Sequence, residues 1–235
     1  MGMGMSFGIT AETGNNIQTD GLVFYVDAAY KKSYPGSGTT WNDLGPNGSN
    51  ATLVGGGTFD SANGGSIVFD GTDDVVTATD AGLPSSSNPR SISAWVKNTR
   101  VNQWKSIVHY GGSSNNTANF FSIGNTADGY KLHMAAFNNT ADGSTDAVPE
   151  EEWCNVVMCY GSNAVDYYIN GSASGGDASY TGVNTTLAGT LAIGEDMFAN
   201  AHIDGNIANL IIYNRKLNAD EVLQNYNAQK ERFGE

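Results

Sequence analysis

The chain has 235 residues, a length that one all-β domain commonly reaches, and its 40% hydrophobic and 10% aromatic residues suffice for a folded core. Acidic residues outnumber basic ones, 24 against 11, so the formal net charge is -13. Such a surface repels nucleic acids and anionic lipids, which excludes both as expected partners. Because no run of about 18 apolar residues occurs, and no basic segment precedes an apolar one, we also expect no membrane span and no secretory leader.

The first 19 residues carry no strand pattern and are expected to form an arm. From residue 20 to residue 214, short apolar or alternating runs are separated by Asn-Gly, Asp-Gly and Gly-Gly pairs, which favour tight turns with positive φ. Many short strands with no helix between them predict an all-β, antiparallel two-sheet sandwich. The predicted strands are 22–26, 66–69, 91–96, 106–109, 120–123, 131–134, 155–160, 165–169, 191–193 and 207–213.

Alternation within the strand at 91–97 predicts which of its faces is buried. Ile92, Ala94 and Val96 share one face, while Trp95 lies on the other with serine and lysine neighbours. Further on, the pair Asn170-Gly171 follows an apolar run and precedes small residues, which predicts a hairpin turn.

Residues 215–235 are expected to form a short helix, over about 219–231, and a tail. Asn218 can cap this helix and Glu221 can complete a capping box. Lys230 and Arg232 fall at its end, where the helix dipole favours cations. With two further basic residues just before the helix, they form a candidate docking contact for an acidic neighbour, made of Arg215, Lys216, Lys230 and Arg232.

The residues that carry most enzyme chemistry are not arranged for it. The acids concentrate in Asp73-Asp74 and Glu150-Glu151-Glu152, neither of which has the strand spacing of a glycosidase pair. The three histidines are scattered and lack the spacing of a zinc site. Cys154 and Cys159 fall at an odd spacing in one strand, which predicts opposite faces and no disulfide between them. We therefore expect no enzymatic activity.

Two oxygen-rich loops offer ligands of the kind that calcium prefers. The first is Asp43-Leu44-Gly45-Pro46-Asn47-Gly48, and the second is Asp70-Gly71-Thr72-Asp73-Asp74. Asp43, Asp73 and Asp74 are the candidate ligands. The same residues also make good turns, so calcium binding and a purely structural role both stay open.

Sugar binding commonly uses an exposed aromatic platform beside amide or carboxylate groups. Four aromatic residues close to Asn-rich loops are candidates for that role. The alternative is that such side chains close the ends of the core. The candidates are Trp41, Trp104, Tyr110 and Phe198.

Several stretches, taken in order over about residues 20–232, together resemble the laminin-G-like, pentraxin-like branch of the concanavalin A-like lectin/glucanase superfamily. They include Gly21–Ala28, Tyr34–Leu44, Ile67–Asp74, Val165–Gly171 and Asp204–Leu217. The resemblance implies a jelly-roll sandwich. The chain departs from the family pattern at one point. Its segment Gly205-Asn206-Ile207-Ala208 lacks the carboxylate that can serve calcium in relatives.

A finer resemblance is to stand-alone laminin-G-like proteins of tailed bacteriophages, carried by Tyr34–Trp41, Glu221–Ala228 and Arg232-Phe233-Gly234. It implies a structural protein on the capsid exterior, in contact with the major capsid protein or another virion protein and present in several copies. The arm or the basic-ended helix would then dock on the shell. The alternative is a carbohydrate-binding adhesin of a tail fibre or a secreted protein, with host surface glycans as partners.

Overall fold

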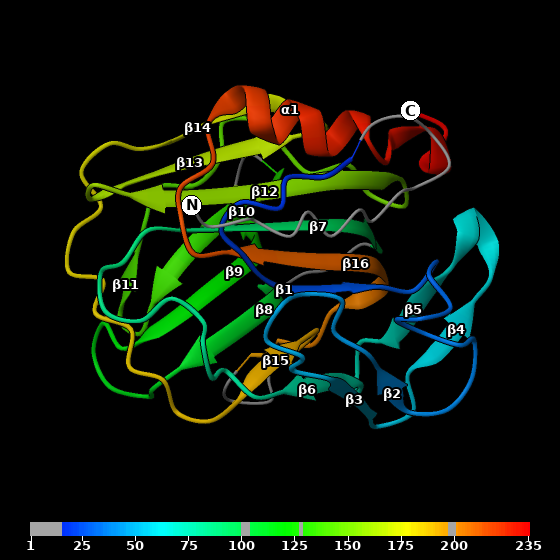
Figure 1. Cartoon of the computed structure of the whole chain (residues 1–235). Helices are drawn as coiled ribbons and strands as arrows, with labels where there is room; N and C mark the ends of the chain where they lie inside the picture. Colours follow the sequence, from blue (N-terminus) through cyan, green and yellow to red (C-terminus); the bar gives the residue numbers. More distant parts are fainter. Residues whose placement is uncertain (1–15, 100–103, 127–128, 197–200) are drawn as a thin grey trace, which may run out of the picture.

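The computed structural model describes residues 16–99, 104–126, 129–196 and 201–235. In this part of the chain, two antiparallel sheets of eight strands each pack face to face, and a single α-helix lies against one of them (Figure 1). The predicted all-β, two-sheet jelly-roll sandwich is confirmed. No described helix has the length and apolar character needed to cross a membrane.

One sheet, here called sheet A, has the strand order β14-β13-β12-β7-β16-β5-β4, with β1 also paired to β16. The long strand β16 reaches both neighbours because β5 pairs with its first half and β1 with its second. The strands of sheet A are β1 (Leu22–Asp27), β4 (Thr58–Asp60), β5 (Ser66–Asp70), β7 (Arg90–Asn98), β12 (Trp153–Gly161), β13 (Ala164–Ile169), β14 (Ser172–Asp177) and β16 (Asp204–Tyr213).

The other sheet, here called sheet B, has the order β11-β10-β9-β8-β15-β6-β3-β2. Several of its strands are too short or too polar to be found from alternation, among them β2, β3 and β11. The strands of sheet B are β2 (Thr40–Trp41), β3 (Ala51–Val54), β6 (Val75–Ala78), β8 (Lys105–Gly111), β9 (Ala118–Thr126), β10 (Gly129–Ala136), β11 (Asn139–Thr140) and β15 (Leu191–Ile193).

The main core fills the space between the sheets, and strand alternation supplies its side chains. In β7, Ile92, Ala94 and Val96 all belong to this core, as the sequence predicts. In β10, Leu132 and Met134 do the same. The intervening residues of each strand therefore point to the outer faces of the sandwich.

The outer face of sheet A carries a second apolar layer beneath the C-terminal segment. Trp95 is fully buried there, with the ring of Phe233 stacked 4.0 Å away and that of Tyr226 5.8 Å away, measured between centroids. Ile17, from the N-terminal segment, is buried in a neighbouring cluster with Val222 of the helix. Both terminal segments thus cover this face, and residues 1–15 of the expected arm lie outside the described residues.

The predicted helix is found with its capping box but is shorter than expected. Helix α1 spans Ala219–Asn227, and the Asn218 side chain accepts from the Glu221 amide at 3.0 Å. A separate 3-10 turn, η2 (Lys230–Phe233), follows it. The expectation that cations occupy the last helical turn is wrong, because Lys230 and Arg232 belong to η2 and α1 has no basic residue there.

The turn and cysteine predictions are confirmed. Asn170 and Gly171 both have positive φ, 48° and 73°, and join β13 to β14 as a two-residue hairpin. Cys154 is part of the core between the sheets, whereas Cys159 is buried on the outer side of sheet A. Both thiols are free, and burial raises the pKa of each to about 12, so neither is reactive at neutral pH.

Candidate functional site

Two of the four candidate sugar-binding aromatics are buried, which corrects that expectation. The indole of Trp41 and the ring of Tyr110 both have 0% exposure. The Tyr110 hydroxyl also accepts from the buried Arg90 guanidinium, at 3.2 Å. These rings close the core of the sandwich, so they offer no face to a ligand.

Trp104 is the one described aromatic side chain that is exposed, at 41%, whereas Phe198 lies outside the described residues. The indole lies over Gly124, where an added Cβ would come within 3.1 Å of it. It also contacts the His133 ring, with centroids 4.4 Å apart. Gly124 therefore lets the Trp104 ring approach the strand closely and lie on the outer face of sheet B.

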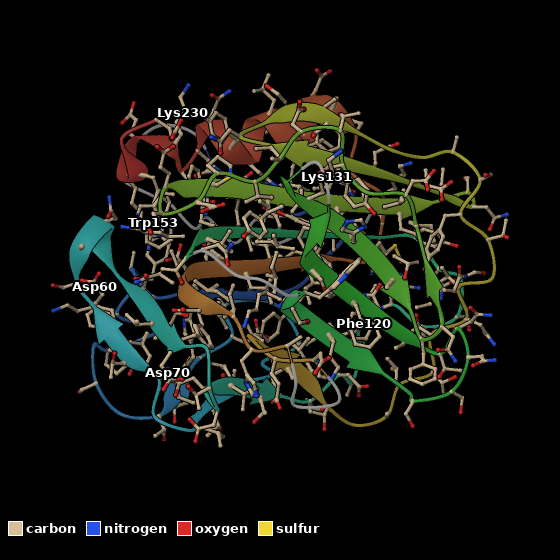
Figure 2. The ribbon with its side chains drawn as sticks, turned by 180° about the vertical axis from the view of Figure 1, so that it is seen from behind. Asp60, Asp70, Phe120, Lys131, Trp153 and Lys230 are labelled. Carbon is tan, nitrogen blue, oxygen red and sulfur yellow. The ribbon has the colours of Figure 1, made fainter. Side chains whose placement is uncertain are left out.

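The same outer face presents a mixed set of polar and aromatic side chains. Ser122 pairs with His133 across β9 and β10, and His109 pairs with Phe120 across β8 and β9. Figure 2 shows this face toward the viewer, with Phe120 on β9 and Lys131 at one end of β10. These residues take the outward positions because their neighbours in each strand belong to the core.

Burial controls the protonation of both histidines on this face. It lowers the pKa of His133, and the Lys131 ammonium lowers it further, while the Ala141 backbone and the Asp142 carboxylate act in the opposite sense. Burial likewise lowers the pKa of His109. Both rings are thus kept neutral at pH 7.

His109 has a defined tautomer because its Nδ1 lies 2.7 Å from the Glu195 carbonyl oxygen. A carbonyl only accepts, so Nδ1 carries the proton and Nε2 is the acceptor. The His133 ring is 93% buried, and both of its nitrogens lie beneath the surface.

Asp43 serves its own loop, the structural alternative that the sequence left open. One carboxylate oxygen accepts from the amides of Tyr25, at 2.9 Å, and Gly45, at 2.7 Å. The other accepts from the Ser49 amide at 2.8 Å. Three backbone amides donate to its two oxygens, so this carboxylate stabilises the turn. Asp43 is therefore not kept as a candidate calcium ligand.

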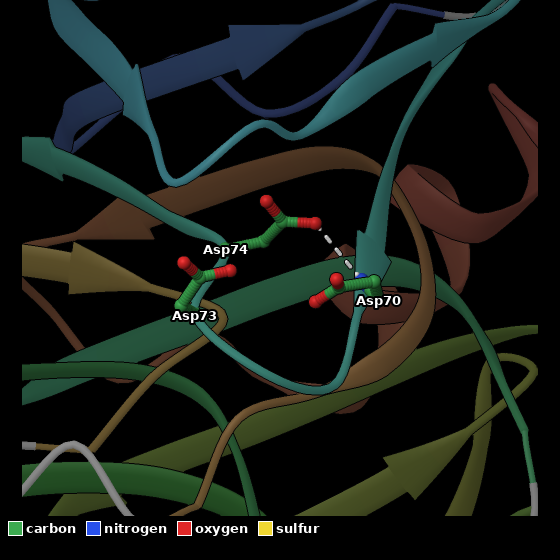
Figure 3. Close-up of side chains that lie close together, drawn as sticks. All are labelled: Asp70, Asp73 and Asp74. Atoms are coloured by element: carbon green, nitrogen blue, oxygen red, sulfur yellow. Dashed lines mark hydrogen bonds between the residues drawn. The ribbon is translucent and has the colours of Figure 1, made fainter.

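The second candidate loop does bring carboxylates together. Oxygens of Asp70, Asp73 and Asp74 lie within 4.8 Å of one another where the chain passes from β5 in sheet A to β6 in sheet B (Figure 3). One Asp74 oxygen accepts from the Asp70 amide at 2.9 Å. Burial raises the pKa of Asp74, as do the negative charges of Asp70 and Asp73. Three convergent carboxylates are suited to a hard divalent cation, and Asp70 joins the two residues that the sequence selected.

The two candidate docking cations before the helix are engaged within the chain. The Arg215 guanidinium donates to both Glu221 carboxylate oxygens, at 2.8 Å each, and this bond lowers the pKa of Glu221. The Lys216 ammonium lies 2.7 Å from a carboxylate oxygen of Asp166.

The two cations of η2 are engaged as well. Arg232 donates to the Asp27 carboxylate at 2.8 Å and also to the backbone carbonyls of Asn63 and Gly65. The Lys230 ammonium lies 5.5 Å from the centroid of the Tyr226 ring. Lys216 and Arg232 thus hold the C-terminal segment on sheet A, and the four residues do not form one free basic patch.

The profile of the concanavalin A-like lectin/glucanases superfamily, in its laminin G form, matches residues 70–223. The chain belongs to this superfamily. No curated protein sequence matches the chain at a significant level. The finer resemblance to bacteriophage proteins is not shown by these matches and stays a prediction.

Solved structures with the same fold confirm this lectin/glucanase architecture. Domain 4 of the extracellular arabinanase AbnA from Geobacillus stearothermophilus, solved in complex with arabinotriose, has a TM-score of 0.69 at 20% identity, over 90% of this chain and 100% of that one. Trypanosoma rangeli sialidase has a TM-score of 0.65 at 15% identity, over 93% of this chain and 34% of its own. The receptor binding domain of botulinum neurotoxin C/D mosaic serotype gives 0.68 at 13%, over 90% and 52%.

The sequence analysis does not predict that His109, Ser122 and His133 share one face, because it considers each histidine separately. The signal was present in the alternation. Leu132 and Met134 are apolar, so Lys131 and His133 must share the opposite face of that strand. What the sequence did not contain was the pairing of β8, β9 and β10 that places these residues side by side.

Proposed function

We propose that this lectin/glucanase-type sandwich is a non-enzymatic carbohydrate-binding module that binds glycans on the outer face of sheet B. The observation that carries the proposal is the position of Trp104. Its indole is exposed at 41%, rests on Gly124 and His133, and points away from the core. An exposed, well-supported aromatic ring is a favourable platform for the apolar face of a sugar ring.

Polar groups beside the platform can recognise sugar hydroxyls. The Ser122 hydroxyl offers a donor and an acceptor, and the Lys131 ammonium, on the same face of β10 as His133, offers donors. His133 supports the platform and does not reach a ligand, because its ring contacts the indole and both of its nitrogens are buried.

The solved relatives support a binding role, since two are named as binding structures: an arabinanase domain in complex with arabinotriose, and a neurotoxin receptor binding domain. At sequence identities of 20% and 13%, these two structures show a shared fold and do not identify a ligand for this chain. The arrangement of carboxylates supports a non-enzymatic role. Asp70, Asp73 and Asp74 converge on one point, as cation ligands do, whereas the two carboxylates of a glycosidase face each other across a sugar.

A glycan screen with two matched variants tests the proposal. Trp104→Ala is expected to weaken binding at least about tenfold, which corresponds to about 1.4 kcal/mol. Leu223→Ala, which removes a side chain of similar exposure, 44%, from helix α1, is the control and should bind as the wild type does. Equal binding by all three proteins would contradict the proposal, and new reducing ends from an incubated glycan would contradict the absence of catalysis.

A place on the exterior of a bacteriophage capsid remains a separate prediction from the sequence. The structure lends the docking hypothesis less support than glycan binding, because Arg215, Lys216 and Arg232 are paired within the chain. Immunogold labelling of particles from the source tests it directly. Gold over the heads would support a decoration protein, and gold on the tail tip or off the particles would support the adhesin alternative.

A further inference from the structure

Charged residues are divided unequally between the two sheets. The eight strands of sheet A contain six aspartates: Asp27, Asp60, Asp70, Asp166, Asp177 and Asp204. The eight strands of sheet B contain no aspartate or glutamate. In a chain with a net charge of -13, the strands of sheet B therefore carry no side chain that would repel an anion.

One cation of sheet B, the Lys131 ammonium, lies near the platform described above, since Lys131 pairs with Gly124, over which the Trp104 indole lies. Lys131 and His133 are two residues apart in β10, so both point to the outer face. The Lys131 ammonium lies close enough to the imidazole to lower the pKa of His133, and its effect exceeds that of the Asp142 carboxylate. The carboxylates that influence the two histidines, Asp142 and Asp196, belong to flanking loops and not to the sheet.

From this division of charge we infer that the outer face of sheet B selects carboxylated sugars, uronic or sialic acids, over neutral ones. The inference rests on the proposed function and specifies its ligand. The sugar ring stacks on Trp104 and its carboxylate pairs with the Lys131 ammonium, while the buried His133 ring supports the indole. A lysine contributes here as a point charge without a fixed geometry, so both kinds of acid fit the same arrangement.

The experiment compares one polymer in two charge states. Binding of the full chain to polygalacturonate and to the same polymer after carboxyl reduction is measured by titration calorimetry at 0.1 M salt, with a chelator present to keep calcium out. Polysialate is a second acidic probe that separates sialic from uronic acids. We expect the wild type to bind at least one acidic polymer tenfold or more tightly than the reduced polymer.

Lys131→Gln should weaken binding to the acidic polymer at least fivefold. Its affinity for the reduced polymer should equal that of the wild type. The matched control is Lys97→Gln, which removes a lysine from β7 in sheet A and should change neither. Equal affinity for the charged and reduced polymers, or an unchanged Lys131→Gln variant, would overturn the inference. Loss of binding to both polymers in Trp104→Ala would still support the proposed function, whereas no binding to any glycan by the wild type would overturn both.

Discussion

The two outer faces of the sandwich differ in what covers them. Over sheet A, helix α1 and the turn η2 bury Trp95, and residues 16–18 pack beside the helix over a neighbouring apolar cluster. Over sheet B, no described helix or terminus lies on the strands (Figures 1 and 2), and Trp104 stays exposed there. One tryptophan thus contributes to stability and the other is left available to a ligand.

An outward-facing aromatic residue does not by itself indicate a binding site. Trp95 and Trp104 both leave the core side of a sheet, yet Trp95 has 0% exposure because the C-terminal segment returns to cover it. That return depends on a pairing between the ends of the chain. Arg232 reaches Asp27 of β1, 205 residues away, and Asp27 is itself 99% buried.

The largest effect that separates the two faces is expected from Arg232→Ala. Removing the guanidinium leaves the buried Asp27 carboxylate without its ion partner, and breaking a buried pair commonly costs about 3–5 kcal/mol. Because Arg232 keeps 17% of its side-chain exposure, we expect a loss at the lower end, about 3 kcal/mol, in urea unfolding.

Lys230→Ala is the matched control. The Lys230 ammonium lies over the face of the Tyr226 ring, and its removal should cost less than about 1 kcal/mol. Glycan binding by the folded Arg232→Ala protein should be unchanged. A similar loss of stability in both variants, or a loss of glycan binding with the fold intact, would show that the two faces are not independent.

Much of the fold follows from the sequence because strand alternation is a local signal. The strand with Ile92 and Val96, the hairpin at Asn170-Gly171 and the cap at Asn218 all depend on neighbouring residues, and all are confirmed. Short strands such as β2 and β11, of two residues each, carry no periodicity to detect.

The candidate site was less predictable because it depends on long-range pairing. Trp41, Tyr110 and Trp104 all lie beside turns, and only the closed sandwich shows that the first two are core residues. Asp73 and Asp74 were selected as adjacent acids, while Asp70 joins them through the return of their own loop.

The loop from Asp70 to Asp74 lies between the two sheets along the chain, so a cation there would tie them together. We expect calcium to raise the free energy of unfolding, by about 2.7 kcal/mol when calcium is at 100 times its Kd. Asp73→Asn should remove this calcium effect, because it removes one of the three converging carboxylate charges. Asp73 is exposed, so its side chain can be replaced without disturbing the core.

Asp43→Asn serves as a control for general loss of a loop carboxylate. That variant should lower stability with and without calcium alike, since Asp43 caps backbone amides. A wild type whose thermal midpoint is the same in calcium and in chelator would show that the three carboxylates hold no ion, and that the loop is a turn only.

The smallest expected effect is a pH dependence that originates on sheet B. Burial lowers the pKa of His109 and His133 in the folded state, so between pH 7 and about 5.5 the unfolded chain, with histidine pKa values near 6.5, binds protons that the folded chain does not. Stability from these two groups is complete above pH 6.5 and is lost as the pH falls below it. Asp74 and Glu195 oppose this, because burial raises the pKa of each and the folded state then gains protons first.

Urea unfolding of the wild type, His133→Gln and the His109→Gln/His133→Gln double variant at pH 7.0 and 5.5 isolates the histidine contribution. The loss of stability on acidification should shrink with each replacement, because a glutamine takes up no proton. The same loss of stability in all three proteins would mean that the two histidines take no part in the pH dependence and that other groups cause it.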